Sequence, residues 1–520
     1  MDTMRSKSNI LLLILLICLV FFCTAIYTKV VARNRRIVKV GILHSLTGPL
    51  SLLEIPLYIT LRRTIDAMNG YSKHKFKIVP IVYDTESKVE LFQKYAELLS
   101  ADESILTIFG CWTSQCRKAI IPILEKYNQN LYYPLQFEGN ECCKNIFYMG
   151  APPNQQIDIG AEYAFKVVSK EKAINSVYLI GSDYVYPRTA NIIIKRYIGE
   201  YKAKLVGETY VPLNKDDTNY IPSIETATNA ILELFVKGAD PYKYDDGCII
   251  FNTINGVEEN NMFYSMLYDK FLKKAKLIES KRLFFDLYPI FSFSMPENQL
   301  KYVNLNAVFR TYSVWNYLRD MTPEVGSPTD KKTPEETENE FFKSVVNDIE
   351  LIGDPTYHSY LSVIFFADYL QFYGSDMEHY DELENDVKDK YAKSGYDISS
   401  PDSKIEIDKI KESKEENKIQ IDASDIVTNR LPKRKEKKTE WSRESLRTYV
   451  GNKLLTPTGY LFLNENHYLS QPAFISIVNT KREYTILYRT PGNILPLAYN
   501  DNRYRCNVVS PLYSSKYITV

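Results

Sequence analysis

The feature that most constrains this chain is a regular alternation of short apolar stretches with amphipathic ones, beginning near residue 37. In a first run, the apolar stretches have the length and composition of strands, and apolar residues recur at helical spacing between them. The predicted strands are residues 37–43, 76–83, 105–109 and 131–133. The predicted helices bury Leu57, Leu61, Ile65 and Met68, then Val89, Phe92, Tyr95 and Leu98, then Ile120, Ile121, Ile123 and Leu124.

A second run of the same kind starts with a strand at residues 176–180 and a helix at 187–201. Further strands are predicted at residues 248–251 and 290–293. Strands separated by helices indicate a mostly parallel sheet with helices on both faces. Two such runs predict an α/β chain with two lobes.

Two later segments break this pattern. Residues 322–337 are rich in Pro, Thr and charge and are predicted to form a loop. Residues 375–439 are highly charged, with few large apolar residues, and end near the basic run 433–438. Such a segment buries too little surface to order itself, so we expect a disordered insertion, with a docking segment or nuclear signal as the alternative. Strands at residues 456–463 and 473–487 complete the fold.

The N-terminal segment at residues 10–28 carries no charge and follows Arg5 and Lys7. Its length suffices to span a bilayer, and an uncleaved signal anchor is favoured over a signal peptide because no convincing cleavage site follows it. Four basic residues after the segment favour a cytoplasmic main domain by the positive-inside rule, so its orientation stays open. These are Lys29, Arg33, Arg35 and Arg36.

Charge and cysteine content exclude several functions. Lys+Arg and Asp+Glu both number 64, so no global field attracts nucleic acid. The spacings Cys111-x4-Cys116 and Cys142-Cys143 do not match a zinc site and no histidine lies near them, so we expect buried free thiols and no metal or cofactor.

Ligands of open α/β sheets bind beyond the carboxyl ends of the strands, and the segments there are informative. Four loops and one connecting segment carry the pattern: HSLTG at 44–48, GCWTSQCRK at 110–118, YPLQFEG at 133–139, GSDYVYPR at 181–188, and GAPPNQQ at 150–156. In this order they resemble the urea and short-chain-amide binding proteins, over about residues 38–321 and 442–496. Those are type I periplasmic binding proteins serving ABC transporters, with a related amide sensor that controls an amidase operon.

The resemblance implies a type I periplasmic-binding-protein fold, with two lobes that are joined by three crossings and close on a ligand without chemistry. It implies an extracytoplasmic receptor for urea, acetamide or formamide, with a permease or signalling partner on another chain; the N-terminal segment would anchor this receptor to the membrane. The expected organisation is an N-terminal anchor or signal peptide at 1–36, lobe 1 at 37–153, 315–374 and 440–453, lobe 2 at 154–314 and 454–496, the insertion at 375–439, and a tail at 497–520.

A neutral amide offers a carbonyl and planar N–H groups without charge, so its pocket needs hydroxyls, amides and aromatic walls. Ser114, with Thr113 beside it, lies at a predicted helix N-terminus, where its hydroxyl and free backbone N–H groups can hold a carbonyl oxygen. The alternative for Ser114 is a helix N-cap, which is compatible with that role. By resemblance, Trp112 and Tyr133 form walls and Gln136 presents its amide.

The resemblance also places Tyr184 and Tyr186 over the ligand from the other lobe, with core packing as the alternative for each aromatic. Glu138 either accepts ligand N–H groups or forms a salt bridge with Arg117 or Lys118. Leu135 and Phe137 depart from the family pattern, where a short polar residue and Tyr are found.

Two other functions were weighed. An amide hydrolase would use Cys111, Lys118 and Glu138 as nucleophile, amine and base, but their loops lack such a family's pattern, so no catalytic residue is expected. The stronger alternative is a sensor or interaction protein that keeps the fold while its ligand is changed or lost.

Overall fold

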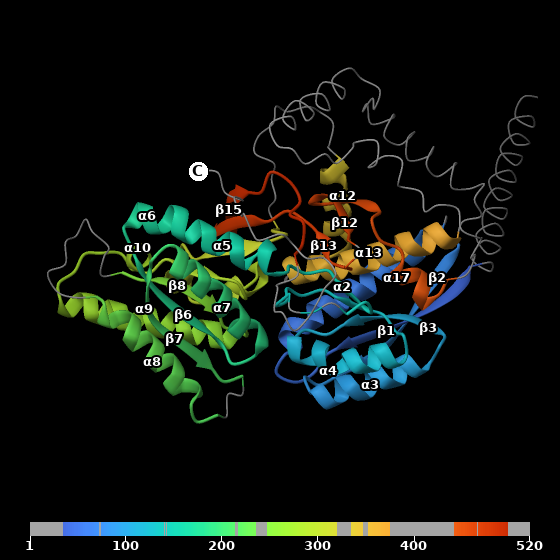
Figure 1. Cartoon of the computed structure of the whole chain (residues 1–520), viewed down its shortest axis with the longest axis horizontal. Coiled ribbons are helices and arrows are strands. Elements are labelled where there is room, and N and C mark those ends of the chain that lie inside the picture. Colours follow the sequence, from blue (N-terminus) through green and yellow to red (C-terminus); the bar gives the residue numbers. More distant parts are fainter. Residues whose placement is uncertain are drawn as a thin grey trace, which may run out of the picture.

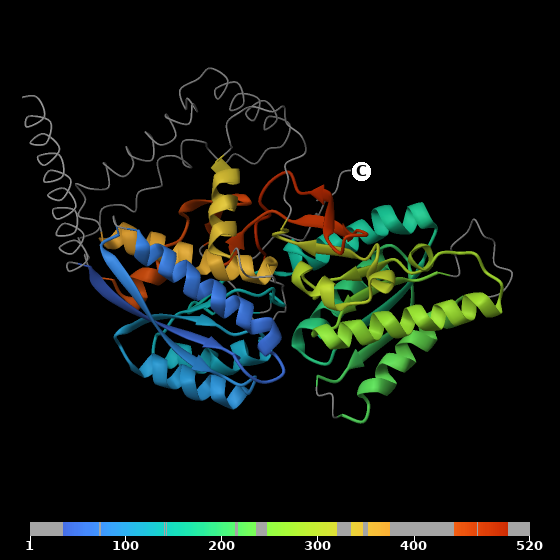
Figure 2. The ribbon, with the colours of Figure 1, turned by 180° about the vertical axis from the view of Figure 1, so that it is seen from behind.

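The chain forms two α/β lobes that lie side by side (Figures 1 and 2). The computed structural model describes residues 35–71, 74–139, 141, 143–213, 217–235, 247–319, 334–346, 352–374, 441–464 and 466–497. The predicted two-lobed architecture with parallel sheets is confirmed.

The first lobe is built on a five-stranded sheet in the order β2-β1-β3-β4-β5, in which all neighbouring strands are parallel. Its strands are β1 (Arg36–His44), β2 (Phe76–Asp84), β3 (Ile105–Gly110), β4 (Leu131–Tyr133) and β5 (Ile146–Tyr148). Its helices are α2 (Ser51–Gly70), α3 (Val89–Ala101), α4 (Ser114–Lys126), α12 (Pro334–Val345), α13 (Asp354–Gly374) and α17 (Arg443–Arg447).

Alternating residues of β1 face two different layers of helices, which explains why the strand is buried from Val40 to His44. Val40 and Ile42 pack with Leu61 of α2 and the apolar face of α13. On the other face, Leu43 packs with residues of α3 and α4. The sheet is therefore covered on both sides, as its continuous apolar strands require.

The second lobe has a seven-stranded sheet in the order β15-β14-β10-β9-β8-β6-β7. Its strands are β6 (Ser176–Ser182), β7 (Lys204–Val211), β8 (Ile249–Thr253), β9 (Ile290–Ser292), β10 (Tyr312–Trp315), β14 (Phe474–Val478) and β15 (Tyr484–Arg489). Strands β6 to β10 are parallel to one another, whereas β14 pairs antiparallel with both β10 and β15.

Helices cover both faces of this second sheet. Tyr178 and Ile180 face the layer of α8 and α9, while Val177 and Leu179 face the layer of α5 and α7. The helical elements are η1 (Pro153–Gln155), α5 (Ile157–Tyr163), the π-helical η2 (Ala164–Val168), α6 (Ser169–Lys172), α7 (Val185–Glu200), α8 (Tyr220–Glu233), α9 (Val257–Leu277), α10 (Phe284–Leu287), η3 (Glu297–Tyr302) and α11 (Leu305–Val308).

Within its described parts, the chain passes between the lobes three times. The first crossing follows β5 at residues 149–156, the second follows β10 at 316–319, and the third precedes β14 at 471–473. A small antiparallel sheet, β11 (Lys453–Thr456), β12 (Gly459–Leu463) and β13 (Leu469–Ser470), leads into the third crossing. Its residues Leu461, Leu463 and Leu469 pack in the core of the first lobe, although we expected residues 454–496 in the second.

The remaining differences from the sequence analysis are local. Strands β5, β7, β10 and β13 were not predicted, and the single strand expected at 456–463 is one end of β11 followed by β12. Of the loop predicted at 322–337, residues 334–337 form the start of α12, and the rest lies outside the described residues. The helical face of α3 was assigned wrongly by one residue, because Leu98 is 51% exposed and Leu99 is buried in its place. Leu99 lies against Gly41, where a β-carbon would stand 2.6 Å from Leu99 Cδ1.

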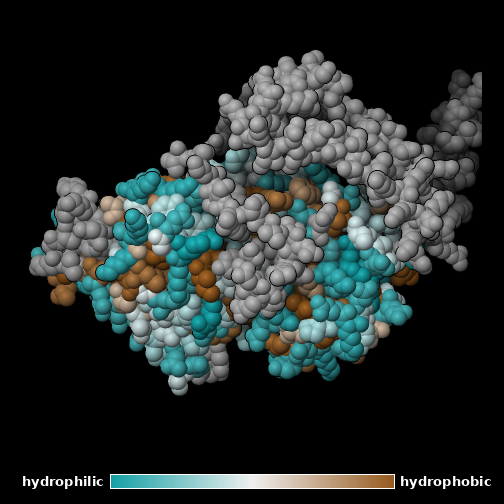
Figure 3. Space-filling model, viewed as in Figure 1, coloured by the Kyte–Doolittle hydropathy of each residue, from teal (hydrophilic) through white to brown (hydrophobic). Residues whose placement is uncertain are grey.

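The predicted membrane anchor at 10–28, the insertion at 375–439 and nearly all of the tail at 497–520 lie outside the described residues. Among the residues that are described, no helix has the length and apolarity needed to cross a bilayer. On the face shown in Figure 3, hydrophilic residues predominate over the described surface of both lobes.

Candidate ligand-binding site

Loops at the carboxyl ends of the two sheets meet between the lobes. Trp112 follows β3, and its Nε1 donates to Oδ1 of Asn255, which follows β8, at 3.4 Å. Gln136 follows β4, and its Nε2 donates to the carbonyl of Phe293, which follows β9, at 3.3 Å. These bonds place two of the predicted ligand residues where the lobes touch.

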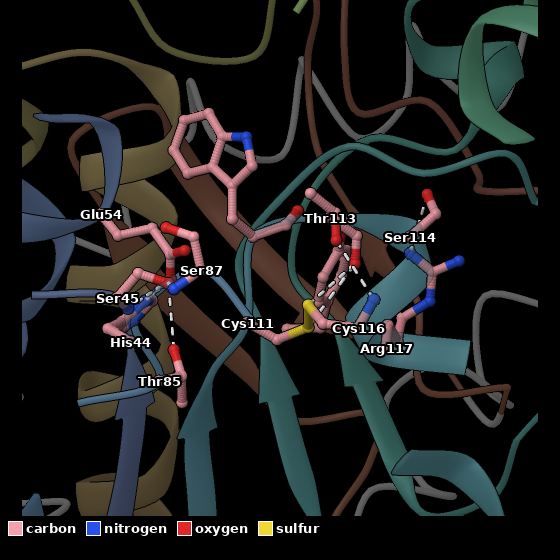
Figure 4. Close-up of a disulfide and its surroundings, with 12 residues drawn as sticks. His44, Ser45, Glu54, Thr85, Ser87, Cys111, Thr113, Ser114, Cys116 and Arg117 are labelled. Carbon is pink, nitrogen blue, oxygen red and sulfur yellow. Dashed lines mark hydrogen bonds and ion pairs between the residues drawn. A yellow bond between two sulfur atoms is a disulfide. The ribbon is translucent and has the colours of Figure 1, made fainter. Parts of the chain in front are cut away.

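The loop between β3 and α4 is tightly fixed (Figure 4). Gly110 has φ +145, and a β-carbon there would lie 2.0 Å from the carbonyl oxygen of Leu43, so this strand end requires glycine. Cys111 and Cys116 form a disulfide with their Cα atoms 6.2 Å apart. The bond joins the end of β3 to the first turn of α4, enclosing Thr113 and Ser114.

This disulfide corrects the expectation of free thiols at Cys111 and Cys116. The loop folds back by one helical turn, which brings the two Cα atoms within the usual range for a disulfide. Cys143 and Cys248 are buried free thiols as predicted, whereas Cys142 and Cys506 lie outside the described residues.

The N-cap of α4 is Thr113 rather than Ser114. The Thr113 side chain accepts from the backbone N–H of Cys116 at 3.1 Å, which satisfies one of the unpaired donors of the first turn. Ser114 is the first helical residue, and its hydroxyl donates to Glu138 Oε2 at 2.7 Å. The two residues therefore have different tasks, one capping the helix and one orienting a carboxylate.

A cluster of four charged side chains lies next to this loop; three are buried and the Lys118 side chain is 31% exposed. The Arg117 guanidinium, with a side chain 0% exposed, contacts Glu138 and Glu141 at 2.8 Å each. Lys118 lies 3.0 Å from Glu138 and 2.9 Å from Glu141. Two cations and two carboxylates cancel, so the cluster has no net charge. The salt-bridge alternative for Glu138 is therefore the arrangement that the structure shows.

Burial by itself would raise the pKa of the two carboxylates in this cluster. The neighbouring Arg117 and Lys118 outweigh that effect, lowering the pKa of Glu138 and bringing that of Glu141 to about 2. Both groups are consequently ionised at neutral pH. Glu141 was not predicted because it lies beyond the loop at 133–139, and no local spacing marks it as a partner of Arg117.

Aromatic side chains of the first lobe surround the cluster, among them Phe137 and Tyr148. Tyr133 donates from its hydroxyl to the carbonyl of Trp112 at 2.8 Å, and the Arg117 guanidinium lies 4.6 Å from the centre of its ring. Across the boundary, burial and the neighbouring Tyr133 and Glu138 raise the pKa of Tyr184. Tyr184 itself is half-buried and packs against the apolar core of the second lobe.

Tyr186 is also buried, but its hydroxyl is already engaged. It donates to Gln156 Oε1 at 2.8 Å, and Gln156 belongs to the first crossing. Gln136, in contrast, has a buried Oε1 atom that accepts no hydrogen bond from the described residues. Among the predicted residues, Gln136 thus has a buried acceptor that the described residues leave unpaired, while the Tyr186 hydroxyl is paired with the first crossing.

Comparison with known proteins identifies the family. The model of the periplasmic binding protein domain matches residues 38–412, which is more than half of the chain. The chain belongs to the periplasmic binding protein domain family. Three solved structures are similar to this periplasmic binding protein in fold.

A solute-binding protein of an ABC transporter from R. palustris, in complex with 4-hydroxybenzoate, is 13% identical with a TM-score of 0.58, covering 88% of this chain and 98% of that chain. An ABC transporter substrate-binding protein from Sphaerobacter thermophilus is 13% identical with a TM-score of 0.58, covering 89% and 100%. A leucine binding protein from Thermotoga maritima is 11% identical with a TM-score of 0.57, covering 87% and 98%. At these identities the likeness shows the fold alone.

The hydrolase alternative does not fit this periplasmic binding protein. Cys111 is held in the disulfide and so offers no thiolate, the species that attacks in such enzymes. Lys118 and Glu138 are paired with each other rather than directed at a free nucleophile.

Proposed function

We propose that this protein is a receptor whose lobes close around a small uncharged solute, urea or a short-chain amide, for transport or sensing. The observation that carries the proposal is the cancellation of charge where the lobes meet. Arg117 and Lys118 are matched by Glu138 and Glu141 within 3.0 Å. A site with this balance favours a solute that brings no charge of its own.

Charged solutes require a different arrangement. A carboxylate ligand needs cationic donors that are free to face it, usually as a bidentate pair with Arg. Here Arg117 Nε donates to Glu141, and Nη2 donates to Glu138 at 2.8 Å and to Glu141 at 3.3 Å. Its Nη1 faces the Ser114 hydroxyl at 3.5 Å. The guanidinium is committed within the first lobe, which disfavours benzoates and amino acids.

Neutral groups supply what a planar amide needs. The free Oε1 acceptor of Gln136 suits an N–H donor, and the Tyr184 phenol from the second lobe suits a carbonyl. Trp112 and Tyr133 provide flat apolar faces on which such a molecule can stack. The proposed contacts come from both lobes, so binding would favour the closed state.

Two observations support an extracytoplasmic location. The family is one of periplasmic binding proteins, and the Cys111–Cys116 disulfide is of a kind that persists in oxidising compartments. A permease or signalling partner on another chain would then bind the closed state. Anchoring through residues 10–28 remains a prediction.

Calorimetry with urea, formamide and acetamide tests the proposal, with 4-hydroxybenzoate and leucine as charged comparisons. We expect saturable heat with at least one neutral solute and none with the charged ones. Gln136→Met should weaken that binding, while Gln115→Met, the same change at an exposed position of α4, should not. Binding of a carboxylate in preference to every amide would overturn the assignment.

One observation favours a second candidate, a receptor-like scaffold with a lost ligand that acts through protein contacts. Trp112 Nε1 and Gln136 Nε2, both predicted to face a solute, donate instead to Asn255 and Phe293 of the other lobe. A closed state held by these direct bonds needs no solute. Calorimetric silence with all five compounds would support this candidate over the receptor.

A further inference from the structure

A buried histidine lies where all three crossings between the lobes come together. His358 is in α13, is 0% exposed and contacts Gln471 of the third crossing. Gln471 in turn contacts Gln155 of the first crossing at 3.0 Å. Asp354, one turn before His358, accepts at 2.9 Å from the backbone N–H groups of Asn316 and Tyr317 in the second crossing.

The amide side chains in this chain of contacts fix which atoms carry protons. Gln155 Nε2 faces two carbonyl oxygens, those of Leu469 at 2.9 Å and Ile494 at 2.8 Å, so it must be the donor end of the amide. Gln155 Oε1 therefore receives Gln471 Nε2, and the carbonyl end of Gln471 faces His358. An amide oxygen only accepts, so His358 Nε2, 2.7 Å away, must donate.

The second ring nitrogen of His358 also faces acceptors alone. Nδ1 lies 3.0 Å from the backbone carbonyl oxygen of Asp354 and 3.0 Å from its Oδ1. A donor at both nitrogens makes the ring an imidazolium. We propose that His358 is a buried imidazolium that couples the three crossings, and that loss of its proton loosens the hinge between the lobes.

The electrostatic surroundings agree with this geometry. Burial opposes the charge on His358, but Asp354 and the two hydrogen-bonded acceptors outweigh it and raise its pKa above the ordinary value. Asp354 is the charged group in contact with the ring. The other contacts of the His358 ring are neutral, namely Gln471 and the Tyr357 ring, whose centre is 5.4 Å away. The Ser362 hydroxyl donates to the backbone carbonyl of His358.

Deprotonation would leave one acceptor without a donor inside the hinge. Either Gln471 Oε1 or Asp354 Oδ1 would lose its bond. Gln471 joins the third crossing to the first, and Asp354 accepts from the second crossing through its other oxygen, Oδ2. Asn316 Nδ2, which donates to the Pro472 carbonyl at 2.7 Å, is a further link between the second and third crossings. Because the folded pKa is raised, the stabilisation is full below about pH 6.5 and is lost as pH rises through the folded pKa.

The expected effect on affinity rests on the proposed function. If the protein closes on a solute, its affinity for that solute should fall as pH rises through the folded pKa of His358. Closure is coupled to binding. When the hinge no longer favours one arrangement of the lobes, a smaller fraction of the molecules is in the arrangement that binds the solute. The histidine proton thus becomes a means by which the surrounding pH sets affinity. His358 acts here as a positioning residue, since it contacts none of the proposed ligand groups.

Nitrogen-detected NMR of the five histidines in the full chain tests the protonation directly, with His358→Gln used to assign the signal. We expect both His358 nitrogens to carry protons at about pH 7, with a pKa above 6.5. Buried His467 is the internal control, because burial and Arg447 lower its pKa. A neutral His358 at about pH 7 would overturn the inference.

Small-angle scattering of the ligand-free protein then tests the hinge independently of any solute. We expect a pH-dependent change in the radius of gyration in the wild type and in His467→Gln, and its absence in His358→Gln. Where an amide binds, wild-type affinity should fall about tenfold per unit of pH above the folded pKa, while His358→Gln stays flat. A protonated His358 with scattering that does not change with pH would refute the hinge role, whether or not an amide binds.

Discussion

Arg117 and Glu138 form a 2.8 Å ion pair in which both side chains are 0% exposed, beside the contact between the two lobes. Together with Lys118 and Glu141, the pair forms a neutral cluster next to the loop that carries Ser114. In this cluster the positive charges of Arg117 and Lys118 are paired, so neither is left for a ligand. Under the proposed function, a solute bound beside this cluster would be selected by its hydrogen-bonding groups rather than by charge.

Removal of the cluster's central cation should be severe. Arg117→Met leaves Glu138 and Glu141 buried with Lys118 as their remaining cation, and breaking a buried pair typically costs about 3–5 kcal/mol. Guanidinium chloride denaturation measures the loss in the free energy of unfolding. Lys126→Met, which breaks the exposed pair with Glu97, is the matched control and should change little. Equal effects of the two substitutions would contradict the account of the cluster.

The Ser114 hydroxyl should matter for binding. Ser114→Ala removes the hydroxyl that donates to Glu138 Oε2. That carboxylate oxygen then either stays unpaired or competes with the proposed binding groups for the N–H groups of the ligand. We expect affinity for the bound amide to weaken by about 1–3 kcal/mol in calorimetry. Ser104→Ala, at an exposed position of the same lobe, serves as the control. An unchanged affinity in Ser114→Ala would reject this pocket assignment.

The disulfide should stabilise the loop that it closes. Loop-closure entropy for a ring with a sequence separation of 5 predicts about 2 kcal/mol of stability that is lost on reduction. Guanidinium chloride denaturation with and without a thiol reductant measures this difference. The double variant Cys111→Ser with Cys116→Ser should be insensitive to reductant. If the reductant lowered the free energy of unfolding equally in the variant and the wild type, the loss of stability would not come from this disulfide.

Acid should weaken the cluster through Glu141. Its folded pKa of about 2 lies below the ordinary 4.5, so its stabilisation is present above about pH 4.5 and is lost as pH falls through about 2. The shift corresponds to roughly 3 kcal/mol. Glu141→Gln should reduce the fall in unfolding free energy on acidification, while Glu97→Gln at the surface should leave it nearly unchanged. An identical acid response in all three proteins would contradict the shifted pKa.

Much of the fold was predictable because its signals are local. Each strand with a following helix leaves a pattern of apolar spacing within a few residues, and β4 begins and ends at the predicted residues 131 and 133. The loops at 110–118 and 133–139 were expected at the site because strand ends of a parallel sheet share one edge. Both loops contact the facing lobe as the two-lobed prediction requires.

What could not be predicted depends on residues far apart in the sequence. The bond between Gln471 and Gln155 joins positions 316 residues apart, and no local pattern indicates such a partner. Glu141 and the Cys111–Cys116 pairing depend on how one loop folds back on another. Strand β7 was missed because most of its residues are partly exposed, which weakens the apolar signal.

The sharpest test of the central claim is a comparison of acetamide with acetate, two ligands of nearly equal shape that differ in charge. Titration calorimetry on the full chain at about neutral pH would give both dissociation constants. We expect saturable binding of acetamide and at least about a tenfold weaker binding of acetate, since both cations of the cluster are paired with carboxylates. Tighter binding of acetate would contradict the central claim.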